Sequence, residues 1–342
     1  MKKRRYQYLL CILFCFLLFN GCSRFDPSKK QQLESEELSP ISKSSFKLNT
    51  VVSITIYDST DTSLLDGALA LCDKYEAMLS KTKEESEICK LNKGISVSLS
   101  KETLSLIETG LYYSKLSNGA FDISIEPLSS LWDFTALSPS VPSKTSIEEA
   151  LRHIGWNYVH ISNQSVSFEQ SDMGIDLGAI AKGFIADRIK EYLLENNVQS
   201  ALINLGGNVL LVGSKPNGDD FKVGIQKPFE DRNETIAIME LSDVSIVSSG
   251  IYERYFKQDD ILYHHILNPS TGYPYDTGLT AVTVITNHSV DGDALSTTAF
   301  ALGLEQGMEF INSLEDVYAV FITKENELYY SDGFKETIPI SN

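Results

Sequence analysis

Cysteine is scarce in this chain of 342 residues, and three of its five cysteines lie within the first 22 positions. Only Cys72 and Cys89 remain in the body of the chain. The sequence has no C-x-x-C motif and no cluster of cysteine and histidine, which argues against a zinc site. The two remaining cysteines could pair in an oxidising compartment, but buried free thiols are at least as good an interpretation.

Basic residues are also in deficit. The chain has 29 lysines and arginines against 46 acidic residues, with a net charge of -17 and a pI near 4.7. A surface that follows nucleic-acid phosphates needs a basic patch, so a nucleic-acid partner is not expected. The excess of acidic residues also suggests that a ligand with a diphosphate group would bind together with a divalent cation. Neither a G-x-x-x-x-G-K-[ST] loop nor a Rossmann glycine fingerprint is present.

A long apolar run occurs only near the N-terminus. Basic residues at 2–5 precede an apolar run at 9–19, which is short for a membrane span and typical of a signal peptide. The run is followed by F-N-G-C, which resembles a bacterial lipobox ending at Cys22. We expect a lipoprotein signal peptide at 1–21, lipid on Cys22 and a flexible tether at 22–45. An ordinary signal peptide or a short anchor helix is the alternative.

The rest of the chain, 46–342, reads as one α+β domain with a sizeable core, since 42% of all residues are hydrophobic. Apolar periodicity predicts helices at 64–79, after Ser100, at 291–302 and at 306–314. A capping box at 145–148 predicts a further short helix. Strands are expected around 52–57, 158–161, 165–168, 201–205, 221–226, 235–241, 244–248, 261–266, 280–286, 317–323 and 327–330.

The segment 176–208 predicts a glycine-spaced turn, an amphipathic helix, a buried strand and a second glycine turn. Gly178 and Gly183 flank the first helical turn, where a bare backbone would let a phosphate approach the helix N-terminus. Asp176 opens the segment. It could bind a donor group of a nucleotide, or cap the helix, or do both.

Two further segments carry side chains suited to chemistry. If 290–302 is helical, Asp293 and Thr297 share one face, which suits Mg²⁺. Helix capping explains the aspartate equally well, and the spacing alone favours capping. In Y-H-H-I-L-N-P, His265 ends a predicted strand and could act as a general base. A structural histidine is the usual alternative, and His264 is the rival imidazole.

From residue 46 onward, at least six ordered segments resemble the ApbE family of FAD:protein FMN transferases. Members of this family are lipoproteins that move FMN from FAD onto a threonine or serine of another protein. The matching segments include G-A-F-D at 119–122, the segment from Asp176, S-S-G-I-Y-E-R-Y-F at 248–256, H-I-L-N-P-S-T-G-Y-P at 265–274 and D-A-L-S-T-T-A-F at 293–300. The resemblance implies a T-fold-related domain of two packed parts, with antiparallel sheets and packed helices.

The resemblance also implies roles for individual residues. Asp293 and Thr297 would bind Mg²⁺ with Ser296 alongside. Ala179 would add a backbone carbonyl, and His265 would deprotonate the acceptor hydroxyl. The residues implied to contact FAD are Leu48, Asn49, Thr82, Ala120, Phe121, Asp122, Asp176, Lys182 and Ile266. For Asp122 a turn cap, and for Lys182 a solvated charge, are the structural alternatives.

The chain departs from the family pattern at a few positions. Leu48 and Asn49 replace the usual Met-Gly, and the Asn49 amide beside the diphosphate could alter the balance between transfer and hydrolysis. Thr82 stands where an aromatic residue is common, which removes a stacking side chain. Asn268 replaces the more usual aspartate, so a role that needs negative charge there is weakened.

Three functions compete on this basis. The first is Mg²⁺-dependent transfer of FMN from FAD to a threonine or serine, with release of AMP. The second is an FAD diphosphatase that uses water as the acceptor, and the third is a lipoprotein that binds flavin without chemistry. The lipid anchor would hold the protein on the extracytoplasmic side of a membrane, facing the periplasm or cell surface. Membrane redox proteins that accept flavin would be its partners there.

Overall fold

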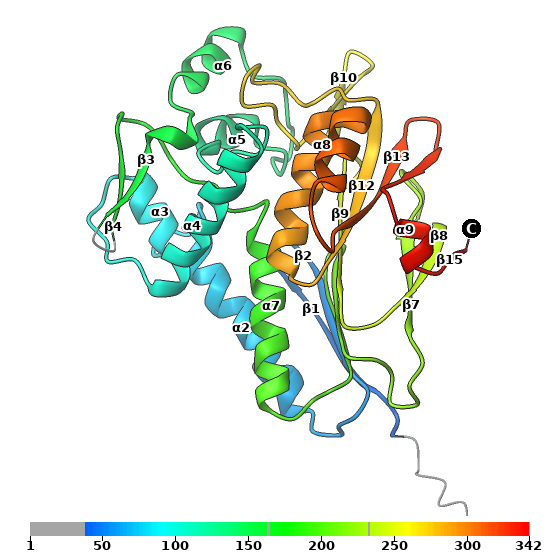
Figure 1. Ribbon diagram of the computed structural model, residues 1–342. Coiled ribbons are helices and arrows are strands. Elements are labelled where there is room, and N and C mark those ends of the chain that lie inside the picture. Colours follow the sequence, from blue (N-terminus) through cyan, green and yellow to red (C-terminus); the bar gives the residue numbers. More distant parts are fainter. Residues whose placement is uncertain (1–37, 163–164, 232, 342) are drawn as a thin grey trace, which may run out of the picture. The chain divides into compact units, whose positions relative to one another are not determined.

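A computed structural model describes residues 38–162, 165–231 and 233–341 (Figure 1). The predicted signal peptide, Cys22 and most of the predicted tether lie outside these residues. The first strand, β1 (Ile41–Lys47), begins inside the segment predicted as tether, so the prediction of 22–45 is too long at its C-terminal end. β1 pairs antiparallel with β2 (Thr50–Ile56), and this pairing orders residues that composition alone assigned to the tether.

An eight-stranded sheet forms the centre of the domain, in the order β1-β2-β5-β6-β9-β12-β13-β14. Every neighbouring pair is antiparallel. The further strands are β5 (Ala201–Leu205), β6 (Asn208–Val212), β9 (Ser245–Gly250), β12 (Leu279–Thr286), β13 (Tyr318–Thr323) and β14 (Leu328–Tyr330). The sequence predicted all of these but β6, whose apolar residues show no alternation because most are buried.

Helices cover one face of this sheet and a smaller sheet covers the other (Figure 1). The helices are α2 (Ser63–Leu79), α7 (Ala181–Glu195) and α8 (Ser289–Asn312), and the smaller sheet has the order β15-β8-β7. It consists of β7 (Phe221–Gln226), β8 (Thr235–Leu241) and β15 (Ile340–Ser341), with α9 (Phe334–Thr337) beside it. Along β12, Val282 and Val284 join the helix-side core while Ala281 and Ile285 join the other, as strand alternation requires. The α+β class is confirmed.

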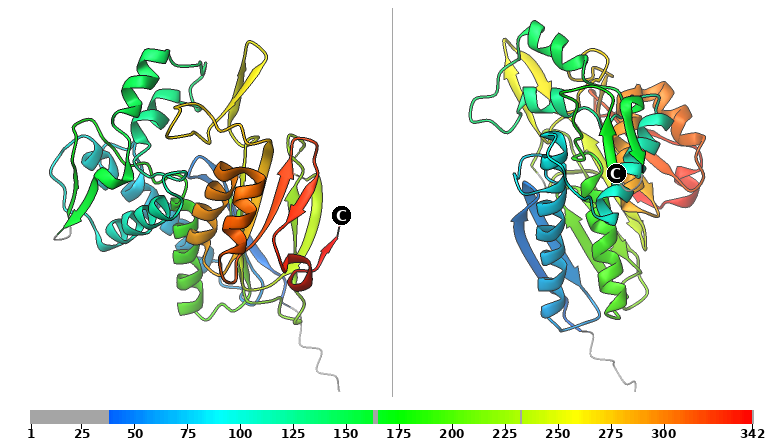
Figure 2. Two further views of the ribbon diagram at one scale, coloured as in Figure 1. Left: turned by 45° about the horizontal axis from the view of Figure 1, so that its top comes forward. Right: turned by 90° about the vertical axis from the view of Figure 1, so that its left-hand side faces the viewer.

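A group of further helices and two hairpins lies beside these layers (Figure 2). It contains α3 (Glu87–Asn92), α4 (Lys101–Leu116), α5 (Glu126–Trp132), α6 (Lys144–Leu151), η1 (Trp156–Tyr158), and the hairpins of β3 (Val159–Ser162) with β4 (Ser165–Phe168) and β10 (Tyr255–Gln258) with β11 (Ile261–His264). The predicted capping box at 145–148 is wrong, because Ser143 caps α6 two residues earlier. Trp132 joins α5 to the turn after β11 by donating to the carbonyl of Gly272 at 2.8 Å.

The junction of α7 and α8 positions the candidate site. Asp187 on α7 accepts hydrogen bonds from the backbone N–H groups of Ser289 at 2.8 Å and Val290 at 2.9 Å. A carboxylate from one helix therefore caps the N-terminus of the other, where free amides and the helix dipole favour negative charge. Within α8, Gly303 has φ 80° and ψ -176°, which breaks the helix between the two segments predicted separately.

Two expectations about the body of the chain can be settled from the described residues. Cys72 and Cys89 are buried free thiols, as the second alternative held, and burial raises the pKa of Cys72 to about 11. In the ranges given above, no helix combines the length and apolar character that crossing a bilayer requires.

Candidate functional site

Asp293 lies in a buried position where the first turn of α7 meets α8. One of its carboxylate oxygens, Oδ2, accepts the backbone N–H of Gly183 at 2.7 Å. Burial raises the pKa of Asp293, while the Lys182 ammonium, the Gly183 amide and the Asn208 side chain favour its charged form. The carboxylate is thus fixed, through Oδ2, by the first turn of α7.

Gly183 has a role that differs from the one predicted. A Cβ at this position would lie 2.2 Å from the carbonyl oxygen of Ser289 and 2.6 Å from Cα of Val290. The bare backbone therefore allows α7 and α8 to touch, rather than admitting a ligand. Gly178, the other glycine of the pair, is exposed, and only Asp176 would lie near its Cβ.

The carbonyl of Ala179 is available to a ligand. In a regular helix the amide of residue 183 would donate to it, but that amide donates to Asp293 instead. No hydrogen bond to this carbonyl is present in the part of the chain that the structure describes. Ala179 is exposed, one turn before Gly183. The position fits the backbone ligand predicted for it.

Three hydroxyl groups lie together where β9 meets α8, next to the backbone of Asp293. Ser249 on β9 is 2.9 Å from Ser296 and 3.0 Å from Thr297, measured between their hydroxyl oxygens. Ser296 also donates to the backbone carbonyl of Asp293 at 3.1 Å. The structure therefore links Ser296 and Thr297 through Ser249, which the sequence alone did not single out, and joins Ser296 to the backbone of Asp293. The role of Asp293, Ser296 and Thr297 as metal ligands stays a prediction.

The two adjacent histidines differ in what their ring nitrogens contact. His264 is buried, its Nε2 lies 2.9 Å from the carbonyl of Tyr275, and its Nδ1 accepts the amide of Ile266 at 3.3 Å. Both nitrogens are used, which is the arrangement of a structural histidine. Burial lowers the pKa of His264 to about 4, so it is neutral at pH 7.

His265 keeps one nitrogen free. Its Nδ1 lies 3.3 Å from the carbonyl of Arg254, and since a carbonyl only accepts, Nδ1 carries the hydrogen. No hydrogen bond to Nε2 occurs among the described residues, so this nitrogen presents a lone pair. Burial, with the Arg254 cation next in effect, lowers the pKa of His265 to about 3. The imidazole is therefore neutral at pH 7, with Nε2 unprotonated, and its role as the general base stays a prediction.

Lys182 connects the histidine with the carboxylate. Its ammonium favours the charged form of Asp293 and disfavours the charged form of His265, so it lies within electrostatic range of both groups. The residue is half-buried at the start of α7. It forms no ion pair among the residues described, which leaves its charge available to an anionic ligand.

Asp176 forms a second polar group in the turn before α7. Its carboxylate contacts Lys81 at 3.0 Å, Ser129 at 2.6 Å and the amide of Gly178 at 2.8 Å. Burial would raise the pKa of Asp176, but these partners outweigh it and hold the pKa below its ordinary value. Asp176 caps the turn and not the helix itself, because α7 begins only at Ala181.

The G-A-F-D segment at 119–122 has mainly structural contacts. Asp122 is buried and accepts the amide of Ser124 at 2.8 Å and that of Trp156 at 3.1 Å, so its turn-capping alternative is confirmed. Phe121 belongs to the main core. Ala120 accepts the hydroxyl of Tyr275 at 3.1 Å, which ties this turn to the segment after His265. The FAD contacts expected of these residues stay predictions.

The remaining residues expected at the flavin are spread over three places. Leu48 and Asn49 form the two-residue turn between β1 and β2, with φ 53° and 56°, as a type I′ hairpin requires. Thr82 is exposed in the loop before α3, where its amide contacts Ser80. Ile266 is buried beside His265 and belongs to the main core. Their contact with FAD stays a prediction.

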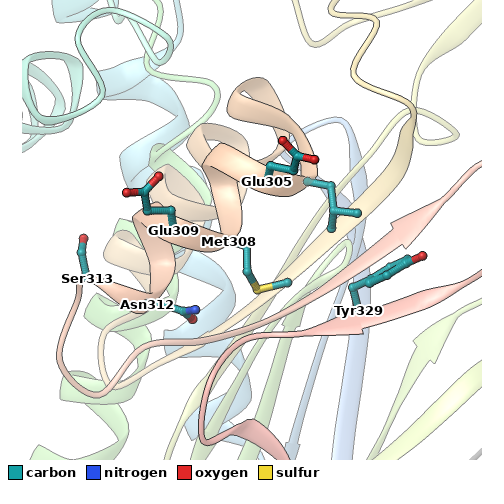
Figure 3. A pocket seen from close by; sticks show the side chains of 7 residues that line it. Glu305, Met308, Glu309, Asn312, Ser313 and Tyr329 are labelled. Atoms are coloured by element: carbon teal, nitrogen blue, oxygen red, sulfur yellow. The ribbon is translucent and has the colours of Figure 1, made fainter.

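A shallow pocket of about 700 Å³ occurs elsewhere, between the second half of α8 and β14 (Figure 3). Its lining includes Glu305, Met308, Glu309 and Tyr329, and no residue of the cluster above. Across the described residues, no three acidic, histidine or cysteine side chains gather as a metal site. The ligand set predicted for Mg²⁺ has one carboxylate, and its other members are hydroxyls and a carbonyl.

Sequence reasoning missed several contributors. Ser249 and Arg254 both lie within the quoted segment 248–256, and Lys81 lies in the S-K-T-K run before α3. Their proximity to the site depends on strand pairing and on loops that meet far along the chain. A lysine or serine in a short motif carries no signal of such a contact by itself.

Comparison with known proteins places these residues in a family. The sequence matches the ApbE family over residues 48–322. It is 38% identical to the FAD:protein FMN transferase of Klebsiella pneumoniae over 278 residues, covering 80% of this chain and 86% of that protein. It is 30% identical to the FAD:protein FMN transferase of Treponema pallidum, covering 87% and 89%. The crystal structure of the ApbE protein from Thermotoga maritima superimposes with a TM-score of 0.81 at 30% identity, covering 87% of this chain and 99% of that one. The chain therefore belongs to the ApbE family.

Proposed function

We propose that this protein transfers FMN from FAD to a threonine or serine hydroxyl of another protein and releases AMP. The names of its relatives support the substrate and the reaction. The single observation that carries the proposal is the orientation of His265, whose Nδ1 faces the carbonyl of Arg254 and whose Nε2 makes no hydrogen bond among the described residues. Lys182 lies within electrostatic range of both His265 and the Asp293 carboxylate, and on this ground we assign the two groups to one substrate site.

The residues that would hold Mg²⁺ are Asp293 and Thr297, with the carbonyl of Ala179. They fit a hard cation because all three offer oxygen and because the Ala179 carbonyl lacks its helical hydrogen bond. When bound, Mg²⁺ would compensate the charge of the FAD diphosphate and of the departing AMP. Lys182 adds a further positive charge at the start of α7, where the helix dipole also favours an anion.

His265 would take the proton of the acceptor hydroxyl on Nε2, while the Arg254 carbonyl keeps Nδ1–H in place. The hydroxyl oxygen would form a bond to the phosphorus on the FMN side of the diphosphate. The bond from that phosphorus to the bridging oxygen breaks, and AMP leaves with the electron pair. The product is a phosphoester between FMN and the threonine.

Hydrolysis of FAD to FMN and AMP is the second candidate. Asn49 is the observation that favours it, because this exposed amide sits at the β1–β2 turn in place of the usual glycine. An amide beside the diphosphate could hold a water molecule where the acceptor hydroxyl should enter. The same base and oxygen ligands would serve both reactions.

The cellular setting is also part of the proposal. A signal peptide and a lipidated Cys22 would hold the enzyme at the extracytoplasmic side of a membrane. Redox proteins with domains on that side would be its flavin acceptors. The strongly acidic composition disfavours nucleic acid as a partner.

A mass spectrum tests the reaction. The full-length protein in detergent is incubated with FAD, Mg²⁺ and a peptide that carries an acceptor threonine. We expect a peptide heavier by one FMN with the native protein and none with Asp293→Ala. Asp291→Ala is the matched control, since this aspartate lies on the same helix but contacts Tyr113. Free FMN with an unmodified peptide would favour hydrolysis, and unchanged FAD would refute both reactions.

A further inference from the structure

A line of hydroxyl groups joins the end of β9 to α8. It runs from Thr297 through Ser249 to Ser296 and ends on the carbonyl of Asp293, with distances of 3.0, 2.9 and 3.1 Å. Three hydrogen bonds are formed, and the three hydroxyl groups carry one hydrogen each. Counting the hydrogens therefore shows which hydroxyl group donates in each of the three bonds.

The carbonyl at the end of the line fixes the direction. A carbonyl oxygen only accepts, so Ser296 donates its hydrogen to Asp293. Ser249 must then donate to Ser296, because the hydrogen of Ser296 is already in use. By the same count, Thr297 donates to Ser249. All three bonds form together only in this order.

The consequence falls on Thr297. Its hydrogen is directed to β9, so its oxygen can offer only lone pairs to anything else. Ser296 is fully buried, whereas Thr297 is the one half-buried residue within 292–301. Thr297, the accessible residue of the line, therefore presents an oxygen that can only accept. The hydrogens of all three hydroxyl groups are used in bonds within the protein.

We propose that Ser249 is a positioning residue that turns Thr297 into a cation ligand. A cation is repelled by an O–H hydrogen and attracted by lone pairs, so the orientation of this hydroxyl decides whether it can coordinate. Outer-shell partners of metal ligands act in this way, and their loss costs about 10- to 100-fold in metal affinity. This inference rests on the proposed function, because it assigns Thr297 to the Mg²⁺ site.

The alternative is that Ser249 only ties β9 to α8. The neighbouring Ser248 supplies a matched control, since its hydroxyl forms a similar bond, at 2.8 Å, to Thr283 on the adjacent strand β12. Removing either hydroxyl would cost a similar amount of stability. Only removal of Ser249 should change how a cation binds.

The test is a titration with Mn²⁺ followed by electron paramagnetic resonance, on the full-length protein with saturating FAD and no acceptor. We expect Ser249→Ala to weaken Mn²⁺ binding about tenfold or more. Ser249→Thr, which keeps a hydroxyl, should stay within about threefold of the native protein, and Ser248→Ala should bind as the native protein does. Thermal midpoints measured without metal show whether each variant is folded.

Two results would overturn the inference alone: native Mn²⁺ affinity in Ser249→Ala, or an equal loss in Ser248→Ala and Ser249→Ala. A different result would reach further. If the native protein and Asp293→Ala bound Mn²⁺ equally, the cation site itself would be wrong, and with it the metal part of the proposed function. The two failures are therefore separable in one set of titrations.

Discussion

Two adjacent histidines show how the backbone around a side chain decides whether it can react. Both ring nitrogens of His264 form hydrogen bonds, one with Tyr275 and one with Ile266, and the residue is buried. In His265, Nδ1 contacts the carbonyl of Arg254, and Nε2 has no hydrogen bond among the described residues. The sequence offered both as candidates, and the contacts of their nitrogens separate a structural residue from a base.

Replacing His265 tests this separation. We expect His265→Gln to lower the rate of FMN transfer by about 10²- to 10⁴-fold, the usual contribution of a general base. Binding of FAD should change little, because the amide keeps a similar volume. Transfer rates under saturating FAD and binding by flavin fluorescence measure the two effects. A variant that transfers FMN at the native rate would remove His265 from the mechanism.

The lowered pKa of His264 leads us to expect that the stability of the protein depends on pH. Its pKa in the folded protein is about 4, against 6.5 for a free imidazole, so below pH 6.5 the unfolded chain gains a proton that the folded protein does not. Stability is therefore lost as the pH falls from 6.5 toward 4. Between pH 7 and pH 5 we expect a loss of about 2 kcal/mol from this residue.

Urea unfolding at the two pH values measures that loss. His264→Gln is the matched variant, because its amide nitrogen reaches about as far as Nε2 and can still donate to Tyr275 but does not titrate. Its unfolding free energy should depend less on pH by about the same 2 kcal/mol. An identical pH dependence in both proteins would show that the burial of His264 does not set its protonation.

At this scale, the sequence predicts proximity best for residues that are close together in the chain. Asp293, Ser296 and Thr297 lie within one turn of a helix, so periodicity alone brings them to one place. Ser249 reaches them only because β9 lies beneath α8. No local pattern encodes that contact, and it could be found only in the folded chain.

At the scale of elements, the site depends on the close contact of α7 with α8. Asp187 caps α8, and Gly183 both donates to Asp293 and leaves room for the backbone of Ser289. The first turn of α7 thus holds the carboxylate and frees the carbonyl of Ala179. Fold stability and the arrangement of the site share the same few contacts.

Gly183→Ala tests that contact. The added Cβ would lie 2.2 Å from a backbone oxygen, so the two helices must separate. We expect a loss of about 1–3 kcal/mol in unfolding free energy, which exceeds the gain of about 1 kcal/mol that alanine brings to a helix. Gly178→Ala, where only Asp176 lies near, is the control and should cost much less. Equal stability of the Gly183→Ala and native proteins in denaturant titrations would contradict the predicted contact.

Most helices and strands followed from periodicity, and the misses have physical reasons. β6 is buried along nearly its whole length, so it lacks the alternation that marks a half-buried strand. β1 is polar and mostly exposed, and it is a strand because it pairs with β2. In both cases pairing within the sheet, rather than local preference, determines the structure.

At the scale of the whole described domain, different elements cover the two faces of the central sheet. One face carries α2, α7 and α8, and the other carries the small sheet of β7, β8 and β15 (Figure 1). The candidate site lies on the helical side, where α7, α8 and the end of β9 meet. The shallow pocket on the second half of α8 shares none of its residues. The proposed cation ligands are thus confined to one junction of an otherwise well-packed fold, and His265 lies in the segment after β11.

The most direct test of the account is the stoichiometry of the reaction. AMP and flavin-bearing acceptor peptide are measured together over time, with Mg²⁺ and with a chelator in its place. The account predicts equal amounts of the two products with Mg²⁺ and neither product with the chelator. AMP in large excess over labelled peptide, or labelling that continues with the chelator, would contradict it.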